Sequence, residues 1–151
     1  MHMNAPARSL LFHVGTVITA LHVASASAEA PERFSGTLSC AKSAFANAAR
    51  REPFTLEIIG KIARYRHTVL NEDGTAGVGT ESGEGPVAPD GRVTLAGGWK
   101  SGAYSYEARY SGTLAATGGQ LSGQQAWKMD GRSGERSCTI TLSKRRRGLV
   151  G

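Results

Sequence analysis

His67 is the one histidine outside the first 28 residues of this 151-residue chain. A nucleophilic serine, threonine or cysteine needs an adjacent base, and histidine is the usual one. His67 stands in the segment ARYRHTV, where Tyr65, His67 and Val69 would share one face of a strand. This setting is typical of a partly buried histidine that is hydrogen-bonded to a neighbour. We therefore assign no catalytic residue and do not expect an enzyme.

Other chemical patterns are also weak. Zinc needs three or four converging ligands, and no spacing of His, Cys, Asp and Glu offers them. A pair of carboxylates could hydrolyse a glycoside, but Glu57 and Glu107 fall on the polar faces of expected strands, where solvated charge is the usual role. The glycine-rich stretch from Gly74 to Gly91 leads into a strand and not into a helix whose N-terminus would hold a phosphate. We expect no metal and no cofactor.

The first 28 residues have the three-part pattern of a secretory signal peptide. A polar start with Arg8 precedes an apolar run from Leu10 to Val23, and the small residues ASASAEA follow, so cleavage is expected before Glu29. The apolar run is shorter than the roughly 20 residues of a membrane-spanning helix. A folded N-terminal helix is the alternative. We expect a periplasmic or secreted protein with a single domain over residues 29–143.

Two cysteines, Cys40 and Cys138, lie near the two ends of that domain. An even number of cysteines in an exported chain usually forms disulfides. Two free thiols, a metal site or a redox site are the alternatives, but a Cys-x-x-Cys spacing is absent. Closing a loop of about 100 residues gives on the order of 4–5 kcal/mol in the chain-entropy model, which is an upper figure. We expect a Cys40–Cys138 disulfide.

Strands must position these residues. From residue 32 onward, apolar or small residues recur at every second position, which indicates half-buried strands. Both cysteines fall on the apolar faces of their segments, so a disulfide between them makes the first and last strands neighbours. The sequence therefore predicts an all-β domain, an antiparallel meander of about seven or eight strands in a small closed or nearly closed barrel. Turn signals separate the strands at NEDG (71–74), APDG (88–91), ATGG (116–119) and MDGRSGE (129–135).

Two segments interrupt this pattern. The alanine-rich residues 41–50 could form one short helix, and residues 74–91 resemble a poor strand followed by a loop. Inward-facing glycines such as Gly36 and Gly112 admit two interpretations: they permit tight coiling, or they leave an internal cavity. Residues that would line such a cavity are Trp99, Tyr104, Tyr106, Gln125 and Trp127.

Charge is concentrated at the C-terminus. Without Arg8 the formal net charge of +6 becomes +5, and Lys144, Arg145, Arg146 and Arg147 supply four of these charges. The domain itself is close to neutral, so we expect no nucleic-acid partner. The basic segment 144–151 is expected to be a disordered tail that contacts an anionic envelope surface weakly, with a solvated chain end as the alternative.

Three short motifs support a resemblance. They are Gly-x-Leu-x-Cys from Gly36 to Cys40, Gly-x-Val-x-Leu-x-Gly from Gly91 to Gly97, and Arg-x-Cys-x-Ile-x-Leu from Arg136 to Leu142. The chain resembles a loose group of short exported bacterial all-β proteins with two cysteines at either end of the domain. The resemblance implies the fold and carries over no catalytic residue.

The function expected from the sequence is a non-enzymatic binding or interaction module, present as a monomer. Its partner would be a small apolar ligand or another protein. One alternative is a periplasmic inhibitor of a hydrolase or protease that inserts a loop such as Gly74–Gly91 into an active site. A carboxylate-based hydrolase is the remaining alternative.

Overall fold

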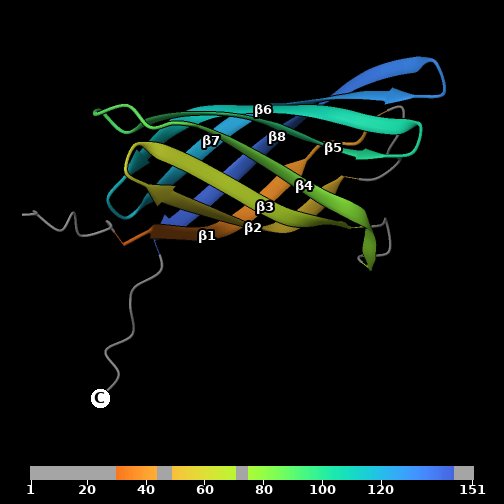
Figure 1. Ribbon diagram of the computed structural model, residues 1–151. Helices are drawn as coiled ribbons and strands as arrows, with labels where there is room; N and C mark the ends of the chain where they lie inside the picture. The colour runs from red at the N-terminus through yellow and green to blue at the C-terminus, as the bar shows by residue number, and fades with distance from the viewer. Residues whose placement is uncertain (1–29, 44–48, 71–74, 145–151) are drawn as a thin grey trace, which may run out of the picture.

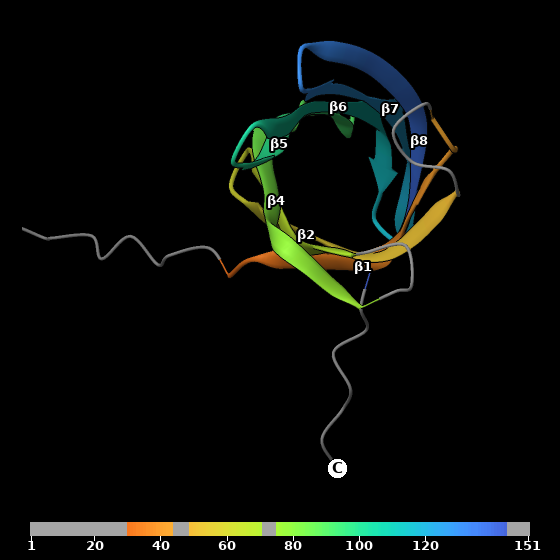
Figure 2. The ribbon, with the colours of Figure 1, turned by 90° about the vertical axis from the view of Figure 1, so that its right-hand side faces the viewer.

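Eight antiparallel strands form a closed barrel in the computed structural model, which describes residues 30–43, 49–70 and 75–144. Each strand pairs with the next, and β8 returns to β1 (Figures 1 and 2). The predicted barrel and meander are confirmed. In chain order the strands are β1 (Glu32–Cys40), β2 (Arg50–Ile59), β3 (Ile62–Leu70), β4 (Ala76–Pro86), β5 (Arg92–Ser101), β6 (Tyr104–Ala115), β7 (Gly118–Met129) and β8 (Arg132–Lys144).

Strict alternation along the strands produces the core. Successive side chains of a strand point to opposite faces of the sheet, so every second residue enters the barrel. The described residues contain no helix that is long and apolar enough to cross a membrane. Deeply buried apolar side chains of this core include Phe34, Leu38, Phe54, Leu56, Val93, Leu95, Leu121, Ile140 and Leu142.

The first and last strands close the barrel at a seven-residue ladder. It runs from Phe34 opposite Lys144 to Cys40 opposite Cys138. A disulfide joins Cys40 to Cys138, as the sequence predicted. Because both cysteines are buried on the inner face, the bond links two strands that are 98 residues apart in the chain.

Three sequence predictions change in detail. No helix occurs in the described part of segment 41–50; residues 44–48 lie outside the described residues, and Arg50 already begins β2. The glycine-rich stretch forms a strand of 11 residues, β4, instead of a poor strand and loop. Gly85 is required by close strand approach, since a Cβ there would lie 1.7 Å from the carbonyl oxygen of Thr94. Lys144 belongs to β8 and not to the tail, while residues 1–29 and 145–151 lie outside the description.

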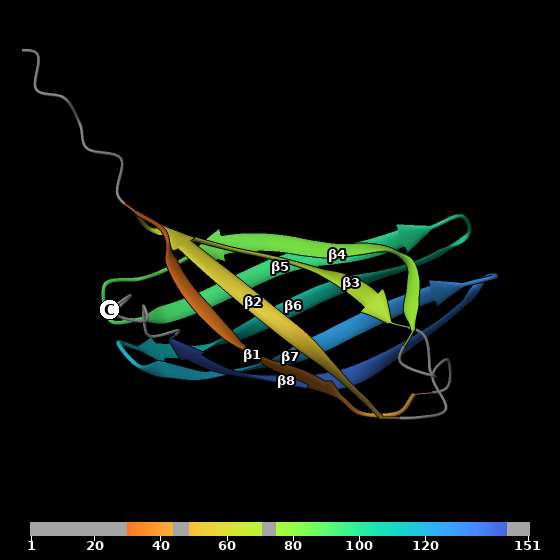
Figure 3. The ribbon, with the colours of Figure 1, turned by 90° about the horizontal axis from the view of Figure 1, so that it is seen from below.

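The two ends of the barrel differ. We call the end that carries the β1–β2, β3–β4, β5–β6 and β7–β8 connections the disulfide end, because Cys40 and Cys138 lie toward it. Toward this end the β3–β4 hairpin separates from both neighbouring strands, and Figure 3 shows β2 and β3 moving apart. Pairing between β2 and β3 stops at Leu56 opposite Tyr65, and pairing between β4 and β5 stops at Ser82 opposite Gly98.

Side chains replace the missing ladders on both sides of this hairpin. On one side, Arg50 of β2 donates from Nη1 to the carbonyl oxygen of Leu70 in β3. On the other, Trp99 of β5 donates from Nε1 to the carbonyl oxygen of Val78 in β4 at 2.6 Å. The outer half of the hairpin is therefore held to the barrel by side-chain hydrogen bonds where the neighbouring backbone pairing has ended.

Candidate functional site

A fully buried carboxylate, Glu81 of β4, lies at the centre of the barrel interior, where no solvent reaches it. Three tyrosine hydroxyls donate to it. Tyr65 and Tyr110 each bond Oε1 at 2.9 Å, and Tyr106 bonds Oε2 at 2.5 Å. An isolated buried carboxylate would be very costly, so these donors from β3 and β6 are what permits the charge inside the barrel.

Two glycines make room for this arrangement. A Cβ at Gly97 would lie 2.5 Å from the hydroxyl oxygen of Tyr65, and a Cβ at Gly83 would lie 2.6 Å from its ring. Any larger residue at either position would displace the Tyr65 ring. Gly83 of β4 and Gly97 of β5 therefore leave the space that the Tyr65 side chain occupies, in addition to permitting the coiling of the sheet.

His67 bridges Glu81 to a second carboxylate. Its Nε2 lies 3.2 Å from Glu81 Oε2, and its Nδ1 lies 3.4 Å from Glu52 Oε2 and 3.2 Å from the carbonyl oxygen of Thr68. Burial alone would lower the pKa of His67, but the hydrogen bond and charge of Glu81 outweigh it and raise the pKa above 6.5. The imidazolium form is thereby favoured, with both N–H groups facing acceptors.

The charge states of Glu81 and of its three tyrosine donors follow from the same contacts. Burial would raise the pKa of Glu81, but hydrogen bonds from His67 and Tyr106 reverse this, so its pKa is lowered and the carboxylate is retained. Burial and the negative charge of Glu81 raise the pKa values of Tyr65, Tyr106 and Tyr110. The tyrosines therefore remain neutral donors.

Gln125 connects this carboxylate to a buried cation. Its Nε2 donates to Glu81 Oε2 at 3.1 Å and to the Tyr110 hydroxyl at 2.9 Å, and its Oε1 accepts from Arg136 Nε at 2.6 Å. The Arg136 guanidinium also lies over the Trp127 ring, 5.2 Å from its centroid. Arg136 is only 5% exposed, so its charge depends on these neighbours.

These contacts form a chain of polar side chains around the barrel interior. Its last step joins Glu52 to Arg50, whose Nη1 lies 3.8 Å from Glu52 Oε1. The positive charge of Arg50 in turn acts on Arg136, where burial and then Arg50 lower the pKa. We call this set the polar ring; its members are Arg136, Gln125, Glu81, His67, Glu52 and Arg50.

Four polar atoms at or beside the polar ring are buried and have no hydrogen-bond partner. They are Arg50 Nε, Glu52 Oε1, Trp127 Nε1 and Arg136 Nη1. Glu52, Trp127 and Arg136 are 5, 8 and 5% exposed, respectively. An unsatisfied buried polar group costs about 1–3 kcal/mol. Glu81 already accepts hydrogen bonds on both oxygens, whereas these four atoms have no partner. A polar molecule would therefore find hydrogen-bond partners in the part of the polar ring around Arg50, Glu52 and Arg136.

The residues predicted from the sequence to line a cavity differ in burial and in position. Tyr106, Gln125 and Trp127 are buried in or beside the cluster. Trp99 is half-buried and lies against Tyr106, with their ring centroids 5.6 Å apart. Tyr104 lies at the rim, where it is 40% exposed and donates to Asp130 Oδ2 at 3.3 Å.

Sequence reasoning missed Glu52, Glu81 and Arg136. A signal existed for Arg136, because it shares the inward parity of Cys138 and Ile140 in β8. Glu81 shares the inward parity of Gly83 and was hidden by the glycine-rich composition of β4. Arg136 and Glu81 could have been identified by treating every charged residue at an inward-facing strand position as a site candidate.

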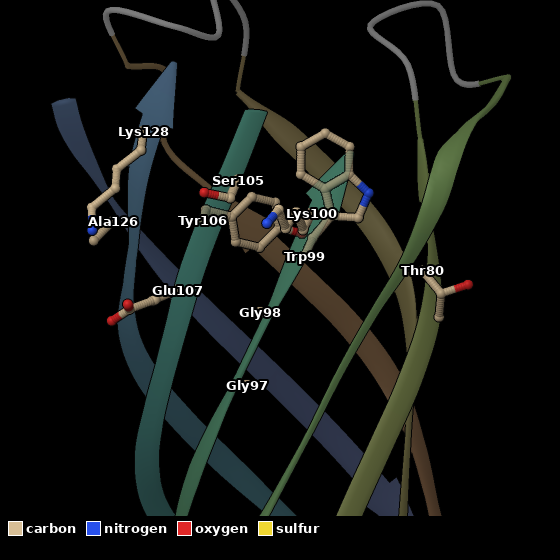
Figure 4. Close-up of a pocket in the computed structure, with 10 residues that line it drawn as sticks. All are labelled: Thr80, Gly97, Gly98, Trp99, Lys100, Ser105, Tyr106, Glu107, Ala126 and Lys128. Atoms are coloured by element: carbon tan, nitrogen blue, oxygen red, sulfur yellow. The ribbon is translucent and has the colours of Figure 1, made fainter. Parts of the chain in front are cut away.

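A surface pocket adjoins the cluster where β4 and β5 diverge. Its volume is about 360 Å³, and Figure 4 shows Trp99 and Tyr106 together among its ten lining residues. Lys100 and Lys128 lie on its exposed walls, and Thr80 is half-buried. Through Tyr106, whose hydroxyl bonds Glu81, this pocket touches the back of the interior cluster.

The basic residues predicted for anion contact lie mostly outside the description. Lys144 ends β8 and forms an ion pair with Glu32, with Nζ 2.6 Å from Oε2. Arg145, Arg146 and Arg147 fall outside the described residues.

No family model, curated protein or solved structure matches this chain. Among the described residues, no group of three or more His, Cys, Asp or Glu side chains is placed to hold a metal ion. The site must therefore be interpreted from its own geometry.

Proposed function

We propose that this chain is an exported small β-barrel binding module, with its ligand site inside the barrel at the disulfide end. The observation that carries the proposal is the set of buried, unpartnered polar atoms on Glu52, Trp127 and Arg136. Apart from these atoms and Arg50 Nε, the buried side-chain nitrogens and oxygens of the described residues have hydrogen-bond partners, so these atoms are expected to bind a ligand or ordered water.

For Glu81 and its three tyrosine donors, binding fits the charge states better than acid–base catalysis does. A general acid or base works best with a pKa near the working pH. Here the pKa of Glu81 is lowered, and those of Tyr65, Tyr106 and Tyr110 are raised, which moves all four away from neutrality. The hydrogen bonds to Glu81 also occupy both of its oxygens. The cluster is thus a rigid support for neighbouring groups.

The polar ring favours a polar ligand over the apolar one expected from the inward glycines. We call the four buried polar atoms that lack a hydrogen-bond partner the open atoms. An apolar molecule beside Arg136 and Glu52 would leave the open atoms of these residues without partners, at a cost of about 1–3 kcal/mol each. A polar molecule of complementary pattern would remove that cost.

Export is the second part of the proposal. The signal pattern before Glu29 supports it, and a buried disulfide is compatible with an oxidising compartment such as the periplasm or the extracellular space. Intact-mass measurement of protein from the cell envelope tests this part. The mature chain should begin at Glu29, and an intact Met1 in that fraction would refute export by this signal.

The binding site is tested by native mass spectrometry of the mature protein purified without denaturation. A non-covalent ligand of low mass should be retained, then lost after unfolding and refolding. The Trp127→Phe variant keeps an aromatic ring but removes the Nε1 donor, so it should retain less ligand. Trp99→Phe is the matched control, because Trp99 Nε1 already bonds Val78. If the refolded protein also shows no indole or arginine NMR shift on addition of a polar metabolite extract, the proposal is wrong.

A further inference from the structure

Three of the four open atoms are N–H donors. They belong to Arg50, Trp127 and Arg136, and only Glu52 Oε1 is an acceptor. A complementary molecule must therefore present several acceptor oxygens and one donor. A carboxylate supplies two acceptor oxygens, one for the open N–H group of each arginine, and hydrogen bonds between charged groups are the stronger ones.

The charge of the polar ring also favours an anion. Arg50 and Arg136 carry two positive charges, and Glu52 and Glu81 carry two negative ones. His67 lies between the two carboxylates, so its protonated form leaves the ring with one excess positive charge. The two arginines repel each other in a buried setting, and an anion between them would relieve that repulsion.

The disulfide lies beside the backbone positions of the two arginines. Cys40 lies opposite Arg50 on β2 and opposite Cys138 on β8, and Arg136 is two residues from Cys138 on the same inner face. Arg136 thus lies on a strand that the disulfide joins to β1, and Arg50 lies on the strand that pairs with β1 at the same point. The side chain of Arg50 is 17% exposed while that of Glu52 is 6% exposed, which places Arg50 on the solvent side.

We infer that the ligand is a small carboxylate that also carries a hydroxyl or ammonium donor, with its carboxylate between Arg50 and Arg136 and its donor on Glu52 Oε1. This inference rests on the proposed function and specifies the ligand class of the same site. Trp127 Nε1 supplies a further donor to the carboxylate or to a second acceptor on the ligand. The satisfied hydrogen bonds of Glu81 and Gln125 hold Arg136 in place for it.

Three probes separate the features of this class. Lactate has a carboxylate and a donor, acetate has the carboxylate alone, and glycerol has donors without charge. Binding is followed by NMR through the Trp127 indole N–H and the Arg50 and Arg136 Nε–H signals of the refolded mature protein. Lactate should shift these signals and bind more tightly than acetate by on the order of tenfold, because it adds a hydrogen bond to a charged group. Glycerol should leave the signals unchanged.

A matched pair of variants tests the role of Arg50. Arg50→Gln should weaken lactate binding by on the order of tenfold or more. Arg51→Gln makes the same charge change on the next residue of β2, which is exposed on the outer face, and should leave binding unchanged. Equal weakening by both variants would mean non-specific attraction and would overturn the inference. If Arg50→Gln does not fold, the Arg50 Nε–H signal of the wild-type protein tests the contact instead. It should shift when lactate is added, and an unchanged signal would overturn the inference.

The outcomes distinguish this inference from the proposed function. If glycerol shifts the indole signal and the two carboxylates do not, the site is real but takes a neutral polyol, so the inference is wrong. If no probe acts but native mass spectrometry retains another small molecule, the inference again fails and the binding function stands. If no probe acts, no molecule is retained and the polar metabolite extract causes no NMR shift, then ordered water satisfies the open atoms and both proposals fail.

Discussion

Arg136 fixes the orientation of the Gln125 amide. Arg136 Nε donates to Gln125 Oε1 at 2.6 Å, so the amide nitrogen must face the opposite way, toward Glu81 Oε2 at 3.1 Å. The two residues lie directly opposite each other on β8 and β7. A neutral side chain thus connects a buried cation to a buried anion without placing the two charges in contact.

Replacing Gln125 by leucine should destabilise the barrel. The variant removes a donor to Glu81 and the acceptor of Arg136, which leaves buried charged groups with fewer partners. We expect a loss of about 1–3 kcal/mol in the free energy of unfolding. Equilibrium urea unfolding measures it.

Gln124→Leu is the control for this change. Gln124 is the preceding residue of β7 and is exposed on the outer face, so its replacement should alter stability by no more than about 0.5 kcal/mol. Similar losses for both variants would show that the polar ring does not depend on Gln125.

Stability should depend on the protonation of His67. Its pKa is raised in the folded protein, because Glu81 outweighs the effect of burial. The resulting stabilisation is fully present below the ordinary value of 6.5 and is lost as pH rises through the higher folded-state pKa. The urea midpoint of the wild-type protein should therefore fall on the alkaline side of about pH 6.5.

The variant His67→Gln should remove this fall, since glutamine does not titrate. His67 is the one histidine after residue 28, so its pKa can also be read directly by NMR in the mature protein. Glu81→Gln removes the negative charge and should bring the His67 pKa down. A His67 pKa below 6.5 in the wild type would contradict the bridging geometry.

The sequence predicted the frame of the barrel better than its interior chemistry. Alternation is a local property, and the inward parity of Cys40 and Cys138 was sufficient to make β1 and β8 neighbours. His67 and Glu81 lie directly opposite each other in the β3–β4 hairpin, but Gln125 of β7 reaches Glu81 only across the closed barrel. No periodicity within one strand contains that information.

The divergence of the β3–β4 hairpin was also hidden. Its outer half pairs internally from Arg66 opposite Ser82 to Leu70 opposite Ala76. Whether such a hairpin also pairs with β2 and β5 depends on sheet coiling and on side chains such as Trp99, not on the composition of β4. Glycine richness suggested a weak strand, whereas glycines such as Gly85 permit the close approach of β5.

The disulfide should stabilise the barrel by closing a long loop. Thiol labelling of the native protein without reductant should find no free thiol, because Cys40 and Cys138 are joined. A variant with both cysteines replaced by alanine should lose stability, with about 4–5 kcal/mol as the upper figure. Reductant should lower the urea midpoint of the wild type and leave that of the double variant unchanged. Two labelled cysteines in native protein would contradict the closure.

The basic C-terminal residues are expected to affect membrane contact and not stability. Replacing Arg145, Arg146 and Arg147 by glutamine keeps chain length and leaves the ion pair of Lys144 with Glu32 intact. Binding to anionic vesicles at low salt should weaken by about 1 kcal/mol per charge removed. Sedimentation with vesicles that contain anionic lipid measures this, and neutral vesicles are the control. Unchanged binding would identify these residues as a solvated chain end.

Trp99 should control local opening of the β3–β4 hairpin. Its Nε1 donates to the Val78 carbonyl at 2.6 Å in the region where β4 and β5 have no ladder, and its ring lies against Tyr106. Trp99→Phe keeps an aromatic ring but removes that hydrogen bond. Amide hydrogen exchange in residues 76–80 should then be faster by on the order of two- to tenfold, with little change in β7.

Gly79→Ala should act similarly, since the φ of Gly79 is 92° and a Cβ there would lie 2.8 Å from Trp99 Nε1. Tyr104→Phe is the control, because it removes an aromatic hydrogen bond at the same end that reaches Asp130 instead of β4. Equal exchange rates in Trp99→Phe and wild type would mean that the hydrogen bond from Trp99 to Val78 does not hold the hairpin closed.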